Sequence, residues 1–206
     1  MRALLLAVGF VAASGLVQAQ PALQERAKVV QADPVALKVA VDAGKKATFF
    51  CANCHGEDGV SKTTDVPNLA GQNPGYLLEQ IRKFATGERK DAFMQGLIKV
   101  LKDEERLQVA LYYANATVRP TPADAVQVAK GKVLFTKLCV RCHGEQAHGN
   151  EVYPRLAGQK QPYLQSSITR YRDNTGIRNN QLMTIATAPL KNEDVIAVAN
   201  YLTQLP

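Results

Sequence analysis

The four cysteines of this 206-residue chain lie in two short motifs that share one pattern. In each motif two residues separate the cysteines, and a histidine directly follows the second one: Cys51-Ala52-Asn53-Cys54-His55 and Cys139-Val140-Arg141-Cys142-His143. This pattern is typical of covalent attachment of c-type haem. The two thiols add to the vinyl groups on one edge of the porphyrin, and the adjacent histidine binds the iron. The motifs therefore predict two covalently attached haem c groups.

Other uses of paired cysteines fit this spacing less well. Disulfides are common in exported proteins, but cysteines only three positions apart and followed by histidine do not favour them. The cysteine pairs of a structural zinc site usually lie about 15–20 residues apart, whereas Cys139 follows Cys51 by 88 positions. A thioredoxin-like redox pair needs a βαβ setting, for which the sequence has no pattern.

One methionine follows each motif and could complete the coordination of an iron. Apart from Met1 the chain contains only Met94, 39 positions after His55, and Met183, 40 positions after His143. A thioether is a soft ligand that favours Fe(II) and raises the reduction potential. Iron that is held by both His and Met has no open position, which suits electron transfer rather than catalysis. We predict these four residues as axial ligands, the alternative being methionines that fill space in the core.

The motifs belong to a tandem duplication. Four further blocks recur at shifts of 87 to 89 positions: Pro-x-Leu-Ala-Gly-Gln at 67–72 and 154–159, Tyr-Leu at 76–77 and 163–164, the methionines, and acidic segments at 102–105 and 191–194. Apolar residues at helical spacing, such as Leu77, Ile81 and Phe84, predict helices over 76–86, 103–114 and 192–202. No stretch alternates with period two. The sequence therefore predicts an all-α protein of two tandem domains.

The first 19 residues have the pattern of a secretory signal peptide. Arg2 precedes an apolar run of 15 residues, and Val17 and Ala19 provide the small side chains that a signal peptidase requires. We therefore predict cleavage after Ala19 and a periplasmic protein. A retained anchor helix is the alternative, although a membrane span needs about 20 apolar residues.

The repeats divide the rest of the chain. Pro120 and Pro122 disfavour a continuous helix between the repeats and favour a short, stiff connector. After the signal peptide at 1–19, we predict an N-terminal extension at 20–43, a first domain at 44–116, a linker at 117–124 and a second domain at 125–206.

Composition limits the partners and the stability of the chain. The net charge is +7, but export excludes nucleic acid as a partner. A positive surface either keeps the protein soluble or, in the second half, favours an acidic docking partner.

Aromatic residues make up 6% of the chain and tryptophan is absent, which is little for two self-sufficient cores. We expect each repeat to depend on its porphyrin as the centre of the core, and the chain without haem to be largely unfolded.

With these motifs, the chain resembles the di-haem class I cytochromes c, most closely the cytochrome c4 family, over residues 44–205. The resemblance implies two cytochrome c-like domains related by a pseudo-twofold axis. It implies a carrier of electrons between a quinol-oxidising complex and a terminal oxidase or reductase. It also implies that the carbonyls of Pro67 and Pro154 accept hydrogen bonds from the ligand histidines. Tyr76 and Tyr163 would lie near the haem propionates, with a packing role as the alternative.

Three features depart from the family pattern. Residues 20–42 have no copy in the second repeat and predict an extra helix or a partner contact. Ala92 stands where relatives often have proline, two residues before Met94, so the local loop is expected to differ. Both halves are positively charged, whereas relatives often carry opposite charges. His148 has no counterpart in the first repeat, and we expect it to be an exposed loop residue.

Two other functions use the same motifs. The chain could be the di-haem electron-transfer subunit of a periplasmic dehydrogenase complex of the sulfide-oxidising flavocytochrome, sulfite or quinoprotein type. A di-haem enzyme such as a peroxidase would need a haem with an open or unusual distal ligand, which a methionine at each site argues against. We expect redox proteins as partners, transient docking at a membrane surface, and a monomer or weak homodimer.

Overall fold

The computed structural model describes residues 19–206, so the predicted signal peptide lies outside the described residues except for Ala19. The described chain is helical and contains no strand, which confirms the all-α prediction. The first half contains α1 (Ala19–Ala32), α2 (Pro34–Ala47), α3 (Phe49–His55), α4 (Pro74–Thr86), α5 (Ala92–Lys99) and α6 (Asp103–Ala114). The second half contains α7 (Ala125–Leu138), α8 (Val140–His143), α9 (Gln161–Arg172), α10 (Gln181–Thr187) and α11 (Asn192–Thr203). None of the described helices is long and apolar enough to cross a membrane.

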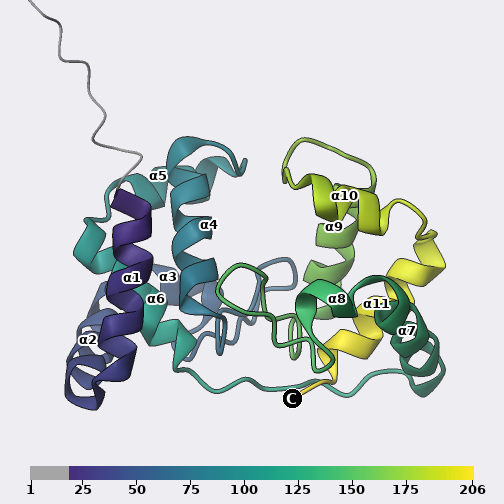
Figure 1. The fold of residues 1–206 in the computed structure, drawn as a ribbon, viewed down its shortest axis with the longest axis horizontal. Helices are drawn as coiled ribbons and strands as arrows, with labels where there is room; N and C mark the ends of the chain where they lie inside the picture. The colour runs from purple at the N-terminus through teal and green to yellow at the C-terminus, as the bar shows by residue number, and fades with distance from the viewer. Residues whose placement is uncertain (1–18) are drawn as a thin grey trace, which may run out of the picture.

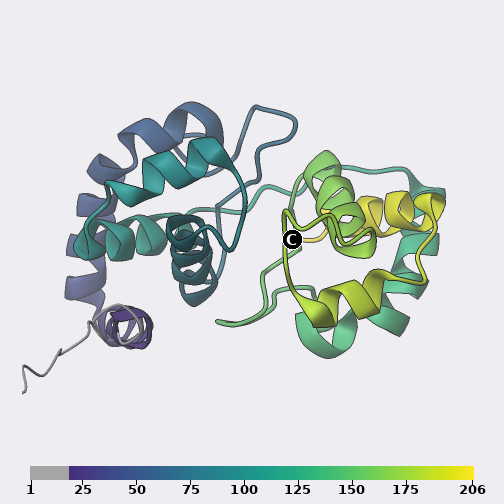
Figure 2. The same ribbon diagram turned by 90° about the horizontal axis from the view of Figure 1, so that it is seen from above.

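The helices form two separate groups that face each other (Figure 1). Helices α1–α6 make up one group and α7–α11 the other, and the extended segment between α6 and α7 passes along one side of both. Seen from above, long loops of the two groups meet in the middle of the molecule (Figure 2). The two domains of the predicted architecture are therefore present as the two halves of the fold.

In each half a long helix that precedes the haem motif, α2 or α7, crosses the last helix at a glycine. Gly44 of α2 lies against the backbone of Gln108 on α6, and Gly131 of α7 lies against the backbone of Ala197 on α11. A Cβ atom at either glycine would overlap the carbonyl oxygen of the facing residue. The same contact therefore occurs in both halves, where it holds α2 against α6 and α7 against α11.

This contact gives a stability prediction. Because the overlap of a side chain at Gly131 would be with backbone, Gly131→Ala should force α7 away from α11 and lower the free energy of unfolding by about 1–3 kcal/mol. Gly96 in α5 is the matched control, since no atom lies within 4 Å of the position that a Cβ would take there. Gly96→Ala should raise stability by about 0.4–1 kcal/mol. Denaturant unfolding of the two haem-loaded variants measures the difference, and equal stabilities would contradict the close crossing.

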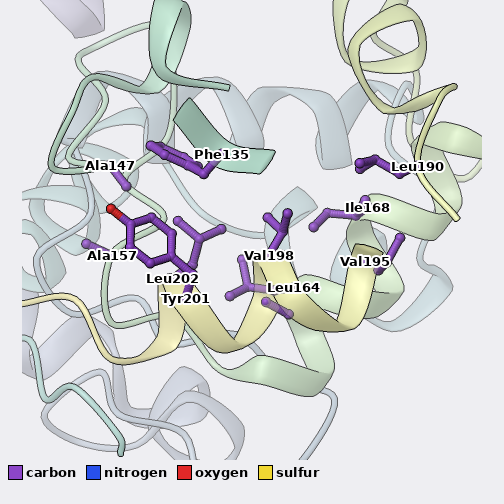
Figure 3. Packing of buried hydrophobic residues seen from close by; sticks show 11 residues of the cluster. Phe135, Ala147, Ala157, Leu164, Ile168, Leu190, Val195, Val198, Tyr201 and Leu202 are labelled. Carbon is purple, nitrogen blue, oxygen red and sulfur yellow. The ribbon is translucent and has the colours of Figure 1, made fainter. Parts of the chain in front are cut away.

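The second half has one continuous apolar core (Figure 3). Leu164 and Ile168 of α9 pack with Val195, Val198 and Leu202 of α11. In the same cluster the rings of Phe135 and Tyr201 lie 5.5 Å apart, at the end where α7 crosses α11.

The first half has two separate buried clusters instead of one. The larger joins α4 and α6 and includes Leu78 and Leu111, while the smaller consists of Ile81, Phe84 and Ile98. The extra helix α1 adds Leu23 and Ala27 to the larger cluster, at 3% and 1% exposure. It is thus part of the core of this half.

The predicted start of the first domain falls within a helix. Residues 34–47 form α2, which begins at the N-cap Asp33 and packs along α6, so the boundary at 43/44 lies near its C-terminal end. The segment that is found only in the first half is therefore α1, which has no counterpart among the described helices of the second half. Residues 117–124 contain no helix, and the domain boundaries themselves stay predictions.

The two halves are joined by reciprocal hydrogen bonds. The side-chain amide of Gln72 donates to the carbonyl of Arg155 (2.9 Å), and its oxygen accepts from the Arg155 N–H (2.7 Å). Gln159 makes the same pair of bonds to Asn68, at 2.9 and 2.8 Å. Because positions 72 and 159 are equivalent in the repeat, this exchange is what a pseudo-twofold axis produces.

Val118 of the linker contacts both halves at equivalent positions. A Cβ atom at either Gly71 or Gly158 would overlap a methyl group of Val118, so one linker residue packs against both glycines. The φ angles of these glycines are +64° and +69°, in the left-handed region that favours glycine. The repeated Leu-Ala-Gly-Gln blocks are therefore explained by the contact between the halves.

Candidate functional site

Each histidine of the two motifs is buried and held by a proline carbonyl. The Nδ1–H of His55 donates to the Pro67 carbonyl oxygen at 2.9 Å, and that of His143 donates to Pro154 at 3.0 Å. Burial lowers the pKa of both imidazoles, which favours the neutral ring. With Nδ1 as the donor, Nε2 keeps its lone pair for a metal ion. These contacts are the ones expected for Pro67 and Pro154.

The cysteines precede these histidines on the same short helical segments. Cys51 and Cys54 lie on α3, Cys139 is the N-cap of α8, and Cys142 lies within α8. All four are free and half-buried thiols. Burial raises the pKa of Cys51 and raises that of Cys139 to about 11. In the chain without haem these two are therefore neutral thiols at neutral pH.

The methionines occupy equivalent helices. Met94 lies in α5 and Met183 in α10, and the N-cap residues Asp91 and Asn180 accept hydrogen bonds from their backbone N–H groups, both at 3.0 Å. The helix of the first half begins at Ala92. The absence of proline at this position is therefore compatible with a capped helix start.

One large cavity connects these residues. Its volume is about 490 Å³, and its lining includes both histidines and both methionines. Cys51, Cys139 and Cys142 also line it, whereas Cys54, on α3, is not among the lining residues. Tyr76 and Tyr163 line the same cavity. The structure thus brings the site residues expected from the sequence around one continuous space that passes from one half into the other.

Two arginines in this cavity were missed by the sequence analysis. Arg89 and Arg178 both donate to the hydroxyl of Tyr163, the former at 3.1 Å. Arg178 also donates to Tyr171 (3.3 Å), while Arg89 donates to Gln80 (2.9 Å). The signal for them was present, because Thr-Gly-x-Arg occurs at 86–89 and again at 175–178, with the shift of the methionines.

Arg178 leaves positive charge buried in the cavity, and the half-buried Arg89 also lines it. Arg178 is only 6% exposed, its Nε has no hydrogen-bond partner, and neither arginine forms an ion pair with a carboxylate of the described residues. Burial alone would raise the pKa of Tyr163, but the guanidinium groups of Arg178 and Arg89 lower it to about 8. Buried charges need partners. The cavity therefore fits a ligand that is apolar over most of its surface and anionic at one edge, as a haem with its two propionates is.

His148 lies in a loop outside this cavity but is half-buried rather than exposed as expected. Its Nε2 is 2.9 Å from the carbonyl oxygen of Pro206, and its own carbonyl accepts a hydrogen bond from Asn73 of the first half (3.0 Å). The loop that carries it lies against the other half, as does neighbouring Glu151, which accepts from the N–H of Gly75 at 2.6 Å. Its place is therefore at the contact between the halves.

Comparison with known proteins points to one family. A family model described as cytochrome c matches residues 128–206. Cytochrome c4 of Pseudomonas aeruginosa is 31% identical over 175 residues, which are 79% of this chain and 87% of that protein. Cytochrome c4 of Azotobacter vinelandii is also 31% identical and covers 79% and 88% of the two chains. The thiosulfate dehydrogenase electron acceptor of Thiomonas intermedia is 31% identical and covers 76% and 78%.

A solved structure agrees with this result. The crystal structure of reduced recombinant cytochrome c4 from Pseudomonas stutzeri superposes with a TM-score of 0.75 at 28% identity, and covers 81% of this chain and 98% of that one. Members of this family carry covalently bound haem c, and both attachment motifs are present here. The chain therefore belongs to the cytochrome c4 family of di-haem class I cytochromes c.

Proposed function

We propose that this protein is a di-haem electron carrier of the periplasm that accepts and delivers one electron at each haem. The observation that carries the proposal is that His and Met from separate helices line the cavity in each half. Haem bound there supplies reversible one-electron chemistry at its iron. His55 and Met94 in the first half, and His143 and Met183 in the second, would each supply one ligand to the iron of their half. A filled coordination sphere favours electron transfer over catalysis.

The polar residues of the cavity hold the other edge of the cofactors. We infer that Arg89 and Arg178 pair with the propionates, with Tyr76 and Tyr163 as additional donors. The hydrogen bonds from Nδ1 of each histidine to Pro67 and Pro154 fix the rings and increase the basicity of Nε2. The chain would thereby orient both haems, and no proton or atom has to move when an electron does.

Arg178 gives a test that does not depend on any partner. A buried cation disfavours the ferric state, because that state carries one more positive charge than the ferrous state. Arg178→Leu should therefore lower a haem reduction potential by on the order of tens of millivolts, where 59 mV corresponds to about 1.4 kcal/mol for one electron. Lys132→Leu, which removes an exposed charge from α7 in the same half, should change it far less. Spectroelectrochemical titration measures both, and equal shifts would contradict the arginine's role.

The partners of this carrier are proposed from the proteins to which the chain is similar. Relatives include cytochromes c4, proteins named thiosulfate dehydrogenase electron acceptor, and a subunit of a cbb3-type oxidase, FixP of Sinorhizobium medicae. We propose a quinol-oxidising complex as donor and a terminal oxidase or reductase as acceptor. The second candidate is an electron-transfer subunit of a dehydrogenase. It is favoured by the superposition on the thiosulfate dehydrogenase TsdBA of Marichromatium purpuratum, at a TM-score of 0.70 over 81% of this chain and 40% of that one.

One experiment separates these candidates. The reduced holoprotein is mixed by stopped flow with membranes that contain a terminal oxidase, and the oxidised holoprotein with a purified thiosulfate dehydrogenase. Rapid, oxidase-dependent oxidation without thiosulfate-dependent reduction supports the carrier between respiratory partners. The opposite pattern supports the dehydrogenase subunit and overturns the first proposal.

The location of the protein is proposed from its first residues. We infer that the signal peptide is removed after Ala19, so that the mature chain begins at Gln20 and works in the periplasm. The Ala19–Gln20 bond then lies at the start of α1, and its hydrolysis leaves Leu23 and Ala27 in the core. N-terminal sequencing of the purified holoprotein tests the site, and a chain that still begins near Met1 would support a retained anchor.

A further inference from the structure

An exposed pair of aromatic rings lies at the start of α3, directly before the first haem motif. Phe49 and Phe50 are 72% and 66% exposed, and their ring centroids lie 5.2 Å apart at an angle of 78°. Neither belongs to the buried clusters of the first half. Large apolar side chains grouped in water often mark a surface that another molecule covers.

The second half has no such pair. The equivalent positions before Cys139 are Lys137, which is exposed, and Leu138, which packs against the core of that half. A half of this fold therefore forms without aromatic residues at these positions. The pair is a property of the first half alone, and helix packing does not explain it.

Positive charge accompanies the rings. Lys45 and Lys46 stand four positions before the two phenylalanines, at the end of α2, and both are exposed. Neither forms an ion pair with any described residue, and the preceding carboxylate, Asp42, is engaged by Lys38 at 2.6 Å. We define these two lysines and two phenylalanines as the Phe49–Phe50 patch. Its charge complements an acidic surface and would repel a second copy of itself.

We propose that the Phe49–Phe50 patch is the surface through which the first haem exchanges electrons with a redox protein whose docking face is apolar and ringed by carboxylates. The inference rests on the proposed carrier function. Phe50 is bonded to Cys51, so a partner seated on the rings lies beside the edge at which haem is attached. In the exchange the partner's centre loses one electron and the haem iron goes from Fe(III) to Fe(II), or the reverse. No atom is transferred.

The test compares the patch with a matched surface of the second half. The probe is an acidic single-haem cytochrome of known higher potential, mixed with the reduced holoprotein at several salt concentrations. Phe49→Ser/Phe50→Ser should lower the second-order rate of electron transfer about tenfold or more, as loss of a central apolar contact does. Val126→Ser/Val133→Ser replaces two valines of α7 that are 76% and 69% exposed, and should change the rate less than about twofold.

Further measurements keep the result interpretable. Lys45→Gln/Lys46→Gln should reduce the salt dependence of the rate. Hexacyanoferrate(III) needs no apolar docking surface, so it should oxidise the reduced phenylalanine variant as fast as the unchanged protein, provided that haem content and potentials are equal. If Phe49→Ser/Phe50→Ser impairs haem attachment, the single variant Phe49→Ser and the lysine variant carry the test.

The outcomes separate this inference from the function on which it rests. Equal rates for the phenylalanine and valine variants would overturn the patch and leave the carrier function intact. An unchanged holoprotein that reacts with hexacyanoferrate but transfers electrons to no redox protein would overturn both. A dimer in sedimentation that the phenylalanine variant dissociates would assign the patch to a second copy and overturn the redox partner.

Discussion

Replacing all four motif cysteines by alanine should yield a chain that no longer folds cooperatively. In the first half both buried clusters line the cavity: Leu77 and Tyr113 belong to the larger cluster, and Ile81, Phe84 and Ile98 to the smaller one. The two are separate clusters of buried residues, and a haem in the cavity would contact both. A half of fewer than 100 residues also buries too little surface to be stable by itself.

The expected signature is a large loss of helical circular dichroism and the absence of a sharp thermal transition. Variants that remove one haem at a time sharpen the test. Cys51→Ala/Cys54→Ala should destabilise mainly the first half, because the second keeps its haem and its single continuous core. The reciprocal bonds of Gln72 and Gln159 should then be lost as well. A native-like spectrum and cooperative melting in the four-cysteine variant would contradict the role of haem as the centre of the core.

Removal of one methionine should change the chemistry of one haem and spare the other. Met183→Ala leaves the second iron without its thioether, so it should become high-spin in the reduced state and bind carbon monoxide. Its potential should fall by on the order of 100 mV, since axial ligands tune haem potentials over about 0.8 V. Met94→Ala is the matched variant for the first haem.

Optical titration under carbon monoxide measures these changes. Each variant should show one altered and one unaltered haem, because the two methionines lie on different helices of different halves. The Asn180 cap still accepts from the backbone N–H at position 183, so the helix should persist. A Met183→Ala variant with two unaltered potentials and no carbon monoxide binding would mean that this methionine is not a ligand.

The chemistry of the site could be predicted from the sequence because it depends on rare residues. Two Cys-x-x-Cys-His motifs and one methionine per repeat leave few other residues that could hold an iron. The long helices could be predicted equally well, because acidic residues lie in the first turns of α6 and α11. In the structure Glu105 and Asp194 accept hydrogen bonds from the N–H groups of the N-cap residues Lys102 and Lys191.

Long-range contacts could not be predicted in this way. Arginine is common on surfaces, so the repeated Thr-Gly-x-Arg segments do not by themselves show what Arg89 and Arg178 do. Their role follows only from the fold, which places both side chains beside Tyr163. The glutamines of the Leu-Ala-Gly-Gln blocks are likewise ordinary in sequence, and their role follows only from the opposite half, where Gln72 meets Arg155. The extra segment before the first domain could be recognised as unrepeated, but its packing through Leu23 could not.

The most direct test of His and Met ligation is a spectroelectrochemical titration of the purified holoprotein, followed by addition of carbon monoxide to the reduced form. With His and Met on each iron, both haems should be low-spin, both should titrate at high potential in one-electron steps, and neither should bind carbon monoxide. The oxidised protein should show the charge-transfer band of a thioether bound to Fe(III). A haem that is high-spin, titrates at low potential or binds carbon monoxide would contradict the proposed ligands and point to catalysis in that half.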